Sequence, residues 1–175
     1  MTKNNDRGLS PQEVLRLINL EKVCVEDGSR SLHESKFTCD MTSTNGREIF
    51  QLDFSRGKID LRYKMQTRHN TIYSLLRLDI GSSTYHDNPR VHIECEEDDP
   101  FYSVHKEYIG YHFAVGEPHM HIFRDGFGDR WAYPIPAEFE NIENLNSTFE
   151  AFMKFSNIIK GPRTYKGIED YGPRR

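Results

Sequence analysis

Residues 37–64, which read FTCDMTSTNGREIFQLDFSRGKIDLRYK, decide the fold class. Two extended runs, 37–41 and 49–54, flank Asn45-Gly46, and Asn-Gly between apolar runs is a strong hairpin signal. A second tight turn leads into 58–64, where charged and apolar residues alternate. This alternation is typical of an antiparallel strand with one solvated face. The segment therefore predicts an antiparallel meander.

Further strands are expected downstream of this meander. Residues 71–80 are more continuously apolar and predict a central strand. Residues 82–89 have the composition of a loop. We expect a short strand at 90–95 and another within 102–115, where aromatic and β-branched residues are frequent.

Two helices frame these strands. Ser10 is the expected N-cap of the first, with Glu13 reaching back to the cap, and its apolar stripe fades near Gly28. Residues 143–160 have the periodicity of a closing amphipathic helix. The order predicts an α+β fold, an antiparallel meander sheet with an N-terminal and a C-terminal helix, and a partly open barrel is the alternative.

Length and composition favour one domain. The chain has 175 residues, 36% hydrophobic and 29% charged, with a formal net charge of -4, which fits neither a disordered chain nor a strongly basic nucleic-acid binder. We expect a single domain at 8–160 and a flexible C-terminal tail at 161–175. Neither a phosphate-binding loop nor a dinucleotide or nucleophile-elbow motif is present, which counts against nucleotide-fold enzymes and α/β hydrolases.

The sequence favours a cytoplasmic location with no membrane partner. The N-terminal residues lack the apolar core of a signal peptide, and no run has the length of a membrane-spanning helix. Cys24, Cys39 and Cys95 match neither a zinc knuckle nor a disulfide framework, so we expect reduced thiols.

The segment PHMHIFR at 118–124 is the most distinctive part of the chain. If it is a strand, His119, His121 and Phe123 lie on one face, and Met120, Ile122 and Arg124 lie on the other. A turn rich in glycine and aspartate and then the aromatic segment 131–136 follow it. A histidine pair in this setting predicts a functional site.

One chemistry that suits such a pair is metal-independent cleavage of RNA. Histidine provides acid and base near neutral pH, and arginine offsets charge on the phosphate. The expected catalytic residues are His119, His121, Arg77, Arg124 and Tyr133. The expected substrate-binding residues are Arg68, His69, Arg62, Lys64 and Trp131. The structural alternatives are that Arg77 pairs with Asp79 or Asp53, and that Trp131 and Tyr133 only pack.

The second chemistry is a metal site. Neutral imidazoles at i and i+2 on one strand can share a zinc ion in a metal-dependent hydrolase. The third ligand would come from His112, His86, His92 or Asp125. Without such a metal, no cofactor is expected.

Several segments together resemble a known group of proteins. Residues 52–59, 66–69, 75–80 and the segment that ends at Pro136 resemble a family of small, largely uncharacterised bacterial and phage proteins. They also look like toxins of toxin-antitoxin modules, and the resemblance implies a compact α+β ribonuclease that binds RNA and a cognate protein partner, either an antitoxin or an inhibited enzyme. The chain departs from that pattern at 81–117, which is short in the resembling proteins.

A non-enzymatic function is the alternative. The acidic cluster at 94–99 would suit a phage or mobile-element inhibitor of the anti-defence or anti-CRISPR type, which binds a protein by imitating phosphate. This function would depend on Glu96, Glu97, Asp98 and Asp99. The structural alternative for the cluster is a solvated loop.

Overall fold

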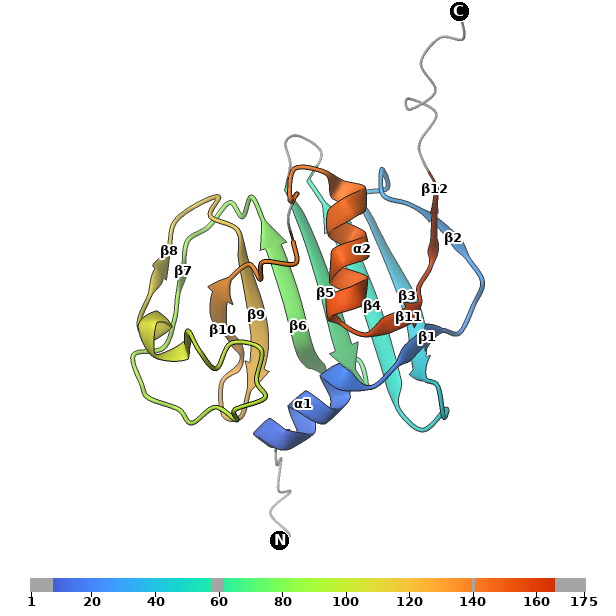
Figure 1. The fold of residues 1–175 in the computed structure, drawn as a ribbon. Helices are drawn as coiled ribbons and strands as arrows, with labels where there is room; N and C mark the ends of the chain where they lie inside the picture. The colour runs from blue at the N-terminus through green and yellow to red at the C-terminus, as the bar shows by residue number, and fades with distance from the viewer. Residues whose placement is uncertain (1–7, 58–61, 140, 166–175) are drawn as a thin grey trace, which may run out of the picture.

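The computed structural model describes residues 8–57, 62–139 and 141–165. Its main feature is an eight-stranded sheet in the order β10-β9-β6-β5-β4-β3-β1-β11 (Figure 1). Neighbouring strands are antiparallel, except for the parallel pair β1 and β11. The strands are β1 (Lys22–Cys24), β3 (Lys36–Ser43), β4 (Ile49–Arg56), β5 (Tyr63–His69), β6 (Tyr73–Ile80), β9 (His119–Arg124), β10 (Gly128–Pro134) and β11 (Ile158–Lys160).

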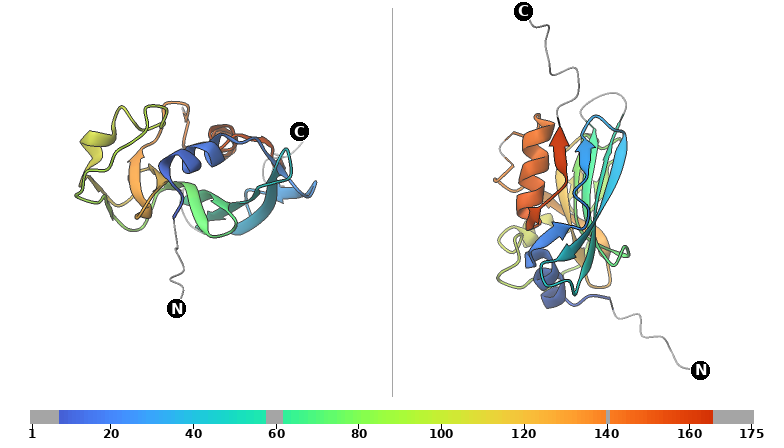
Figure 2. Two further views of the ribbon diagram at one scale, coloured as in Figure 1. Left: turned by 90° about the horizontal axis from the view of Figure 1, so that it is seen from below. Right: turned by 90° about the vertical axis from the view of Figure 1, so that its right-hand side faces the viewer.

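Two helices, α1 (Pro11–Asn19) and α2 (Leu145–Phe155), lie on one face of this open sheet (Figures 1 and 2). The predicted α+β class, with an N-terminal and a C-terminal helix, is confirmed. Shorter elements flank the sheet. They are a parallel ribbon of β2 (Ser29–Ser31) and β12 (Arg163–Tyr165), an antiparallel ribbon of β7 (His86–Asp87) and β8 (His112–Phe113), and the single-turn 3₁₀ helix η1 (His105–Tyr108).

The predicted hairpin at Asn45-Gly46 is confirmed. Strands β3 and β4 pair antiparallel across it, and Gly46 has a φ of 70°, which glycine adopts without a steric penalty. The predicted strand at 58–64 falls largely outside the described residues. In the described part, β5 begins at Tyr63 and continues to His69, so Arg68 and His69 lie on a strand.

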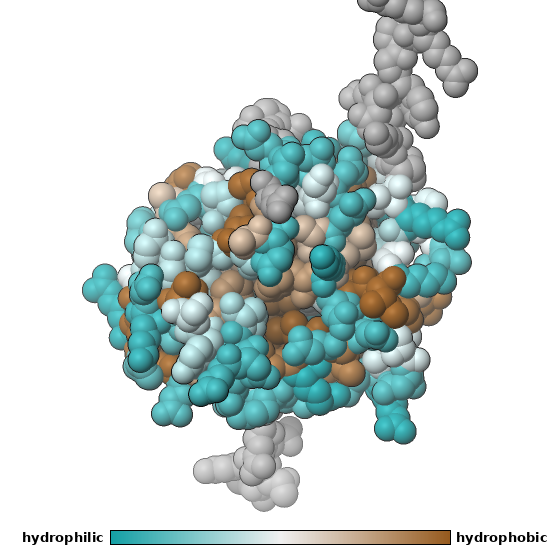
Figure 3. All heavy atoms as spheres, in the orientation of Figure 1, coloured by the Kyte–Doolittle hydropathy of each residue, from teal (hydrophilic) through white to brown (hydrophobic). Residues whose placement is uncertain are grey.

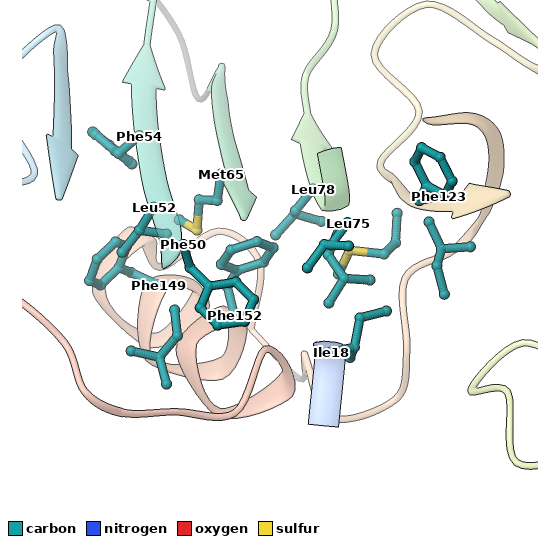
Figure 4. Packing of buried hydrophobic residues seen from close by; sticks show 14 of the residues in the cluster. Ile18, Phe50, Leu52, Phe54, Met65, Leu75, Leu78, Phe123, Phe149 and Phe152 are labelled. Carbon is teal, nitrogen blue, oxygen red and sulfur yellow. The ribbon is translucent and has the colours of Figure 1, made fainter. Parts of the chain in front are cut away.

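The core lies between the sheet and the two helices. Phe149 and Phe152 of α2 face Phe50 and Leu52 of β4, and all four side chains are fully buried (Figure 4). Burying a side chain of this size stabilises a fold by about 1.5–3 kcal/mol. Seen from the helix side, the surface has a hydrophilic rim with apolar residues toward its middle (Figure 3).

Both helices are shorter than predicted. Ser10 caps α1 by accepting the Glu13 N–H, but the Glu13 side chain pairs with Arg16 instead of returning to the cap. Helix α1 ends at Asn19, because the chain turns extended there and forms β1. Helix α2 spans only Leu145–Phe155, since the last residues of the predicted helix pair with β1 as β11.

The strands predicted at 90–95 and within 102–115 are wrong apart from two residues. Residues 90–95 form no regular element, and 102–115 contain only η1 and the short strand β8. The first residues of the expected C-terminal tail form β12 against β2, and 166–175 lie outside the described residues. Neither helix in the described ranges is long and apolar enough to cross a bilayer.

The side chain of Asn88 completes the outer edge of β10. Its amide nitrogen donates to the Ala132 carbonyl at 2.7 Å, and its amide oxygen accepts the Ala132 N–H at 2.8 Å. The same nitrogen also donates to the Tyr108 carbonyl at 2.8 Å. The buried Asn88 side chain therefore takes the place of a ninth strand and fixes the 81–117 segment against the sheet.

Cys24 and Cys39 form a disulfide, so the expectation of reduced thiols is wrong for this pair. They lie on the neighbouring strands β1 and β3, with Cα atoms 6.5 Å apart, within the usual span of a disulfide. Cys95 is free.

The Lys22 side chain links the C-terminal ends of the two helices through hydrogen bonds. Its buried ammonium donates to the carbonyls of Ile18 and Leu20 at 2.8 Å, and to that of Ser156 at 2.9 Å. It also lies 4.9 Å from the centre of the Phe50 ring. A lysine here satisfies carbonyls that the ends of α1 and α2 leave without helical partners.

We predict that Lys22 makes stability depend on pH. Burial lowers the pKa of its ammonium from 10.5 to about 7. Between these values the unfolded chain binds more protons than the folded chain, so the free energy of unfolding rises with pH, by up to about 1.4 kcal/mol per pH unit. Urea denaturation of wild type and Lys22→Met at pH 7, 8 and 9 measures this. Equal slopes in the two proteins would contradict the prediction.

Candidate functional site

A cavity of about 460 Å³ opens on the face of the sheet opposite the helices. Alternation along β5 and β6 explains its polar lining. Tyr63, Met65 and Leu78 point into the core. Their neighbours along the strands, Lys64, Arg77 and Asp79, point outward and line the cavity. The charged, imidazole and phenol side chains that line the cavity are those of Arg56, Arg62, Tyr63, Lys64, Arg77, Asp79, Tyr85, His86, His119 and His121.

The register of three strands brings the central groups together. Asp79 of β6 lies opposite His119 of β9, and Arg77 lies opposite His121. On the other side of β6, Lys64 of β5 lies opposite Asp79. Side chains directly opposite each other on one face of a sheet are close neighbours. The two histidines, the carboxylate and the arginine thus form one cluster.

Hydrogen bonds fix both imidazoles in the same tautomer. His119 Nδ1 donates to the Glu117 carbonyl at 2.8 Å, and His121 Nδ1 donates to the Asp129 carbonyl at 2.9 Å. Because a carbonyl only accepts, each proton is assigned to Nδ1, and Nε2 keeps its lone pair. These Nε2 atoms lie 3.8 Å and 3.3 Å, respectively, from Oδ2 of Asp79.

Arg77 links the cluster to the β9–β10 turn. Its Nε donates to Asp79 Oδ2 at 3.1 Å, one terminal nitrogen donates to His121 Nε2 at 2.8 Å, and the other binds Asp129. The second oxygen of Asp79, Oδ1, is buried and has no hydrogen-bond partner among the described residues. The Lys64 ammonium lies 3.8 Å from Oδ1.

Burial keeps the histidines neutral. It lowers the pKa of His121 to about 4 and also lowers the pKa of His119. Burial opposes ionisation of Asp79, but the positive charges of Arg77 and Lys64 outweigh that effect and hold the pKa of its carboxyl below the ordinary value. At neutral pH the cluster therefore consists of two neutral imidazoles, one carboxylate and one guanidinium.

The structure divides the expected catalytic residues between two faces. His119, His121 and Arg77 line the cavity. Arg124 lies on the opposite face of β9, as alternation predicts, where it pairs with Asp99 and donates to the Tyr133 hydroxyl at 3.1 Å. Burial raises the pKa of Tyr133. Arg124 and Tyr133 thus belong to a buried polar network that anchors the 81–117 segment.

The expected substrate-binding residues also separate. Arg62 and Lys64 line the cavity. Arg68 donates to Asp53 at 2.7 Å on the outer face, and the buried His69 contacts Glu48 at 2.8 Å. Trp131 is fully buried and packs against the ring of His105, with centroids 4.8 Å apart. None of these last three residues lines the cavity.

The third group beside the two histidines is Asp79. The ligand atoms of Asp79, His119 and His121 all lie within 4.8 Å of one another. His112 is exposed on β8, where it binds Asp87 at 2.7 Å. His86 lies nearer, with its ring centre 4.6 Å from that of His121, but its Nε2 is bonded to Asn88 and to the Arg130 carbonyl.

Sequence reasoning missed Asp79, Asp129 and Tyr85 as site residues, and it offered His86 only as one of four possible third metal ligands. The alternation of Leu76–Asp79 was a usable signal for Asp79, because it places the carboxylate on the same face of β6 as Arg77. Tyr85 and His86 lie in a segment whose composition predicts only a loop, and no local pattern places them beside the histidines.

Comparisons with known proteins give one match. No curated protein and no solved structure matches the chain. Residues 9–158 match a group described as "Family of unknown function (DUF6978)". The matched range runs through the segment 81–117, and it agrees with the expected resemblance to uncharacterised proteins. Since the match spans most of the sequence, the chain belongs to this family of unknown function, DUF6978.

Proposed function

We propose that this protein is a toxin-like cytoplasmic endoribonuclease that cleaves RNA in the cavity around Asp79. The observation that carries the proposal is the pair of buried, tautomer-fixed imidazoles, which share an anionic partner at the floor of a cavity with cations at its rim. Phosphodiester cleavage needs a base for the nucleophile and positive charge for the phosphorane. The cavity offers both kinds of group.

Each group has a role that follows from its position. Arg62 and Lys64 lie on one wall and would hold the phosphate. His119 Nε2 has its lone pair toward the cavity and would accept a proton from the attacking hydroxyl. Arg77 would stabilise negative charge in the transition state through its fixed fork of donors. The lowered pKa values of the histidines favour roles as bases or ligands over a matched acid and base pair.

Cleavage of a labelled RNA by the purified chain tests the proposal. We expect wild type to cleave, and the variant His119→Ala/His121→Ala to be slower by at least about 100-fold, the scale of general base catalysis. His33→Ala, which removes an exposed histidine outside the cavity lining, is the matched control. Circular dichroism verifies that each variant is folded. Folded wild type that cleaves no RNA, or a double variant that cleaves at the wild-type rate, would overturn the proposal.

Tyr85 provides a second prediction. Its side chain is 61% exposed and lines the cavity, where its ring can stack on a base of bound RNA. Base stacking on an aromatic ring contributes about 1–3 kcal/mol. We therefore expect Tyr85→Ala to weaken RNA binding by about 5- to 150-fold, measured by fluorescence anisotropy. Tyr102→Ala, which removes an exposed tyrosine outside the cavity lining, is the control. Equal affinity for Tyr85→Ala and wild type would exclude this role.

A further inference from the structure

We infer that Asp79, His119 and His121 bind one divalent transition-metal ion of the zinc class. If the protein is the proposed ribonuclease, this ion would be its cofactor, and that part of the inference rests on the proposed function. As a binding site, it rests on the geometry of three described side chains. The ion would lie between β6 and β9, at the floor of the cavity.

The separations of the ligand atoms suit a metal. For bonds of about 2.0–2.1 Å, the edge of a tetrahedron of ligands is about 3.3 Å. Asp79 Oδ2 lies 3.3 Å from His121 Nε2 and 3.8 Å from His119 Nε2. His119 Nε2 would have to move by about half an ångström to reach that edge length from Asp79, and the three ligand atoms, which lie within 4.8 Å of one another, would have to close around the ion.

The outer contacts of the histidines are those of metal ligands. A ligating histidine usually donates its other ring N–H to a carbonyl or carboxylate, which fixes the tautomer and aims the lone pair at the metal. His119 and His121 both do so, with the carbonyls of Glu117 and Asp129 as acceptors. Both carbonyls come from segments that flank β9, so the fold itself orients the two lone pairs.

The charge distribution also calls for a cation. Two nitrogen lone pairs and a carboxylate converge on one point. Arg77 and Lys64 already offset part of this negative potential, and a divalent ion between the ligands would lower the electrostatic energy further. Asp79 Oδ1 is buried without a hydrogen-bond partner among the described residues. An ion held by both oxygens of Asp79 would satisfy it.

Arg77 already occupies part of this position. Its guanidinium donates to His121 Nε2 at 2.8 Å, so metal binding must break that one hydrogen bond. Because the guanidinium is a rigid planar group, its shift away from His121 would also weaken its contact with Asp79 through Nε. We expect the guanidinium to swing toward the cavity, where it would face a phosphate bound to the metal.

The donor set defines the class of ion. Two imidazoles and one carboxylate suit Zn²⁺, Mn²⁺, Fe²⁺ or Co²⁺, whereas Mg²⁺ and Ca²⁺ prefer sites made only of oxygen. Three protein ligands leave at least one coordination position open toward the cavity, which is typical of a catalytic site. With the ion bound, His119 Nε2 would be a ligand and no longer the base, and water in the open position, acidified by the ion, would be the nucleophile in its place.

Isothermal titration of the EDTA-treated and dialysed chain with Zn²⁺ tests the site. We expect one ion per chain, and an affinity at least about 100-fold lower for Asp79→Asn, more than the loss typical of an outer-shell change. Asp53→Asn is the matched control, because Asp53 also pairs with an arginine on this face of the sheet. His119→Gln repeats the test if Asp79→Asn fails to fold.

Titration with Co²⁺ identifies the ligands. We expect visible bands from nitrogen and oxygen ligation with no thiolate charge-transfer band, which separates this site from binding at Cys95. No binding by wild type, a thiolate band, or equal affinity in both folded ligand variants would overturn the site.

RNA cleavage separates this inference from the proposed function. Cleavage that survives EDTA in a chain that binds no metal would overturn the metal site and leave the ribonuclease. Metal binding that depends on Asp79 in a chain that cleaves no RNA would do the reverse.

Discussion

Arg77→Met is expected to slow RNA cleavage by about 100- to 1000-fold, the loss seen when one preorganised charge-stabilising donor is removed from an active site. Arg77 contacts Asp79, His121 and Asp129, and in the proposed reaction its guanidinium offsets charge on the phosphate. Its removal should leave the affinity for Zn²⁺ equal to that of wild type or higher, because the variant no longer covers His121 Nε2. Initial cleavage rates and titration calorimetry measure the two effects.

Two further variants separate the role of Arg77 from loss of a surface charge. Arg68→Met removes an arginine that also pairs with an aspartate on the outer face of the sheet, and we expect it to cleave nearly as fast as wild type. Arg77→Lys restores the charge without the planar fork, so only a small part of the rate should return. Equal losses in Arg68→Met and Arg77→Met would show that general surface charge, not Arg77, sets the rate.

Asp99→Asn is expected to lower the free energy of unfolding by about 3–5 kcal/mol, the cost of leaving one partner of a buried ion pair without the other. Arg124 is only 7% exposed and Asp99 only 6%, and the guanidinium has both carboxylate oxygens as acceptors. Removing the negative charge leaves the Arg124 cation without a counter-ion beside the ring of Tyr133, 5.4 Å from its centre. Urea denaturation measures the loss.

Two comparisons make this result interpretable. Asp53→Asn breaks a more exposed pair with Arg68 and should cost no more than about 1 kcal/mol. The double variant Asp99→Leu/Arg124→Met removes both charges and should be more stable than Asp99→Asn, because apolar groups of similar size replace a buried pair well. A double variant less stable than Asp99→Asn would mean that the pair itself contributes most of the stability.

Local patterns predicted the two histidines and Arg77 as site residues, but neither Asp79 nor how these groups meet. Alternation placed His119 and His121 on one face of β9, and the same rule places Arg77 with Asp79 on β6. Which residue of β6 lies opposite His119 depends on the register between strands that are distant in the sequence, and no local signal fixes that register.

Alternation also carried information about Arg124. It placed Arg124 on the face opposite the two histidines, which is where the structure has it, although its charge made it attractive as a phosphate ligand. The charge of Arg124 suggested a place in the site, whereas its position on the strand placed it on the other face, and the position gave the correct answer.

The segment 81–117 was the least predictable part of the chain. Its aromatic and β-branched residues favour strands, but those that join the core do so from irregular chain and one 3₁₀ turn, and several others are exposed. The contacts that determine this conformation, Asn88 with Ala132 and Asp99 with Arg124, join residues far apart in the sequence. The acidic cluster at 94–99 is an example: its residue Asp99 is buried in the ion pair with Arg124 and is not part of a solvated loop surface.

The Asn88 side chain has a consequence for self-association. An outer strand with free N–H and C=O groups is a template on which another chain can add a strand and begin aggregation. At Ala132 both groups are already bonded to one amide of the same molecule. Asn88 thus makes it harder for a strand of a second molecule to pair with β10. It has no such effect at the opposite edge of the sheet, which β11 forms.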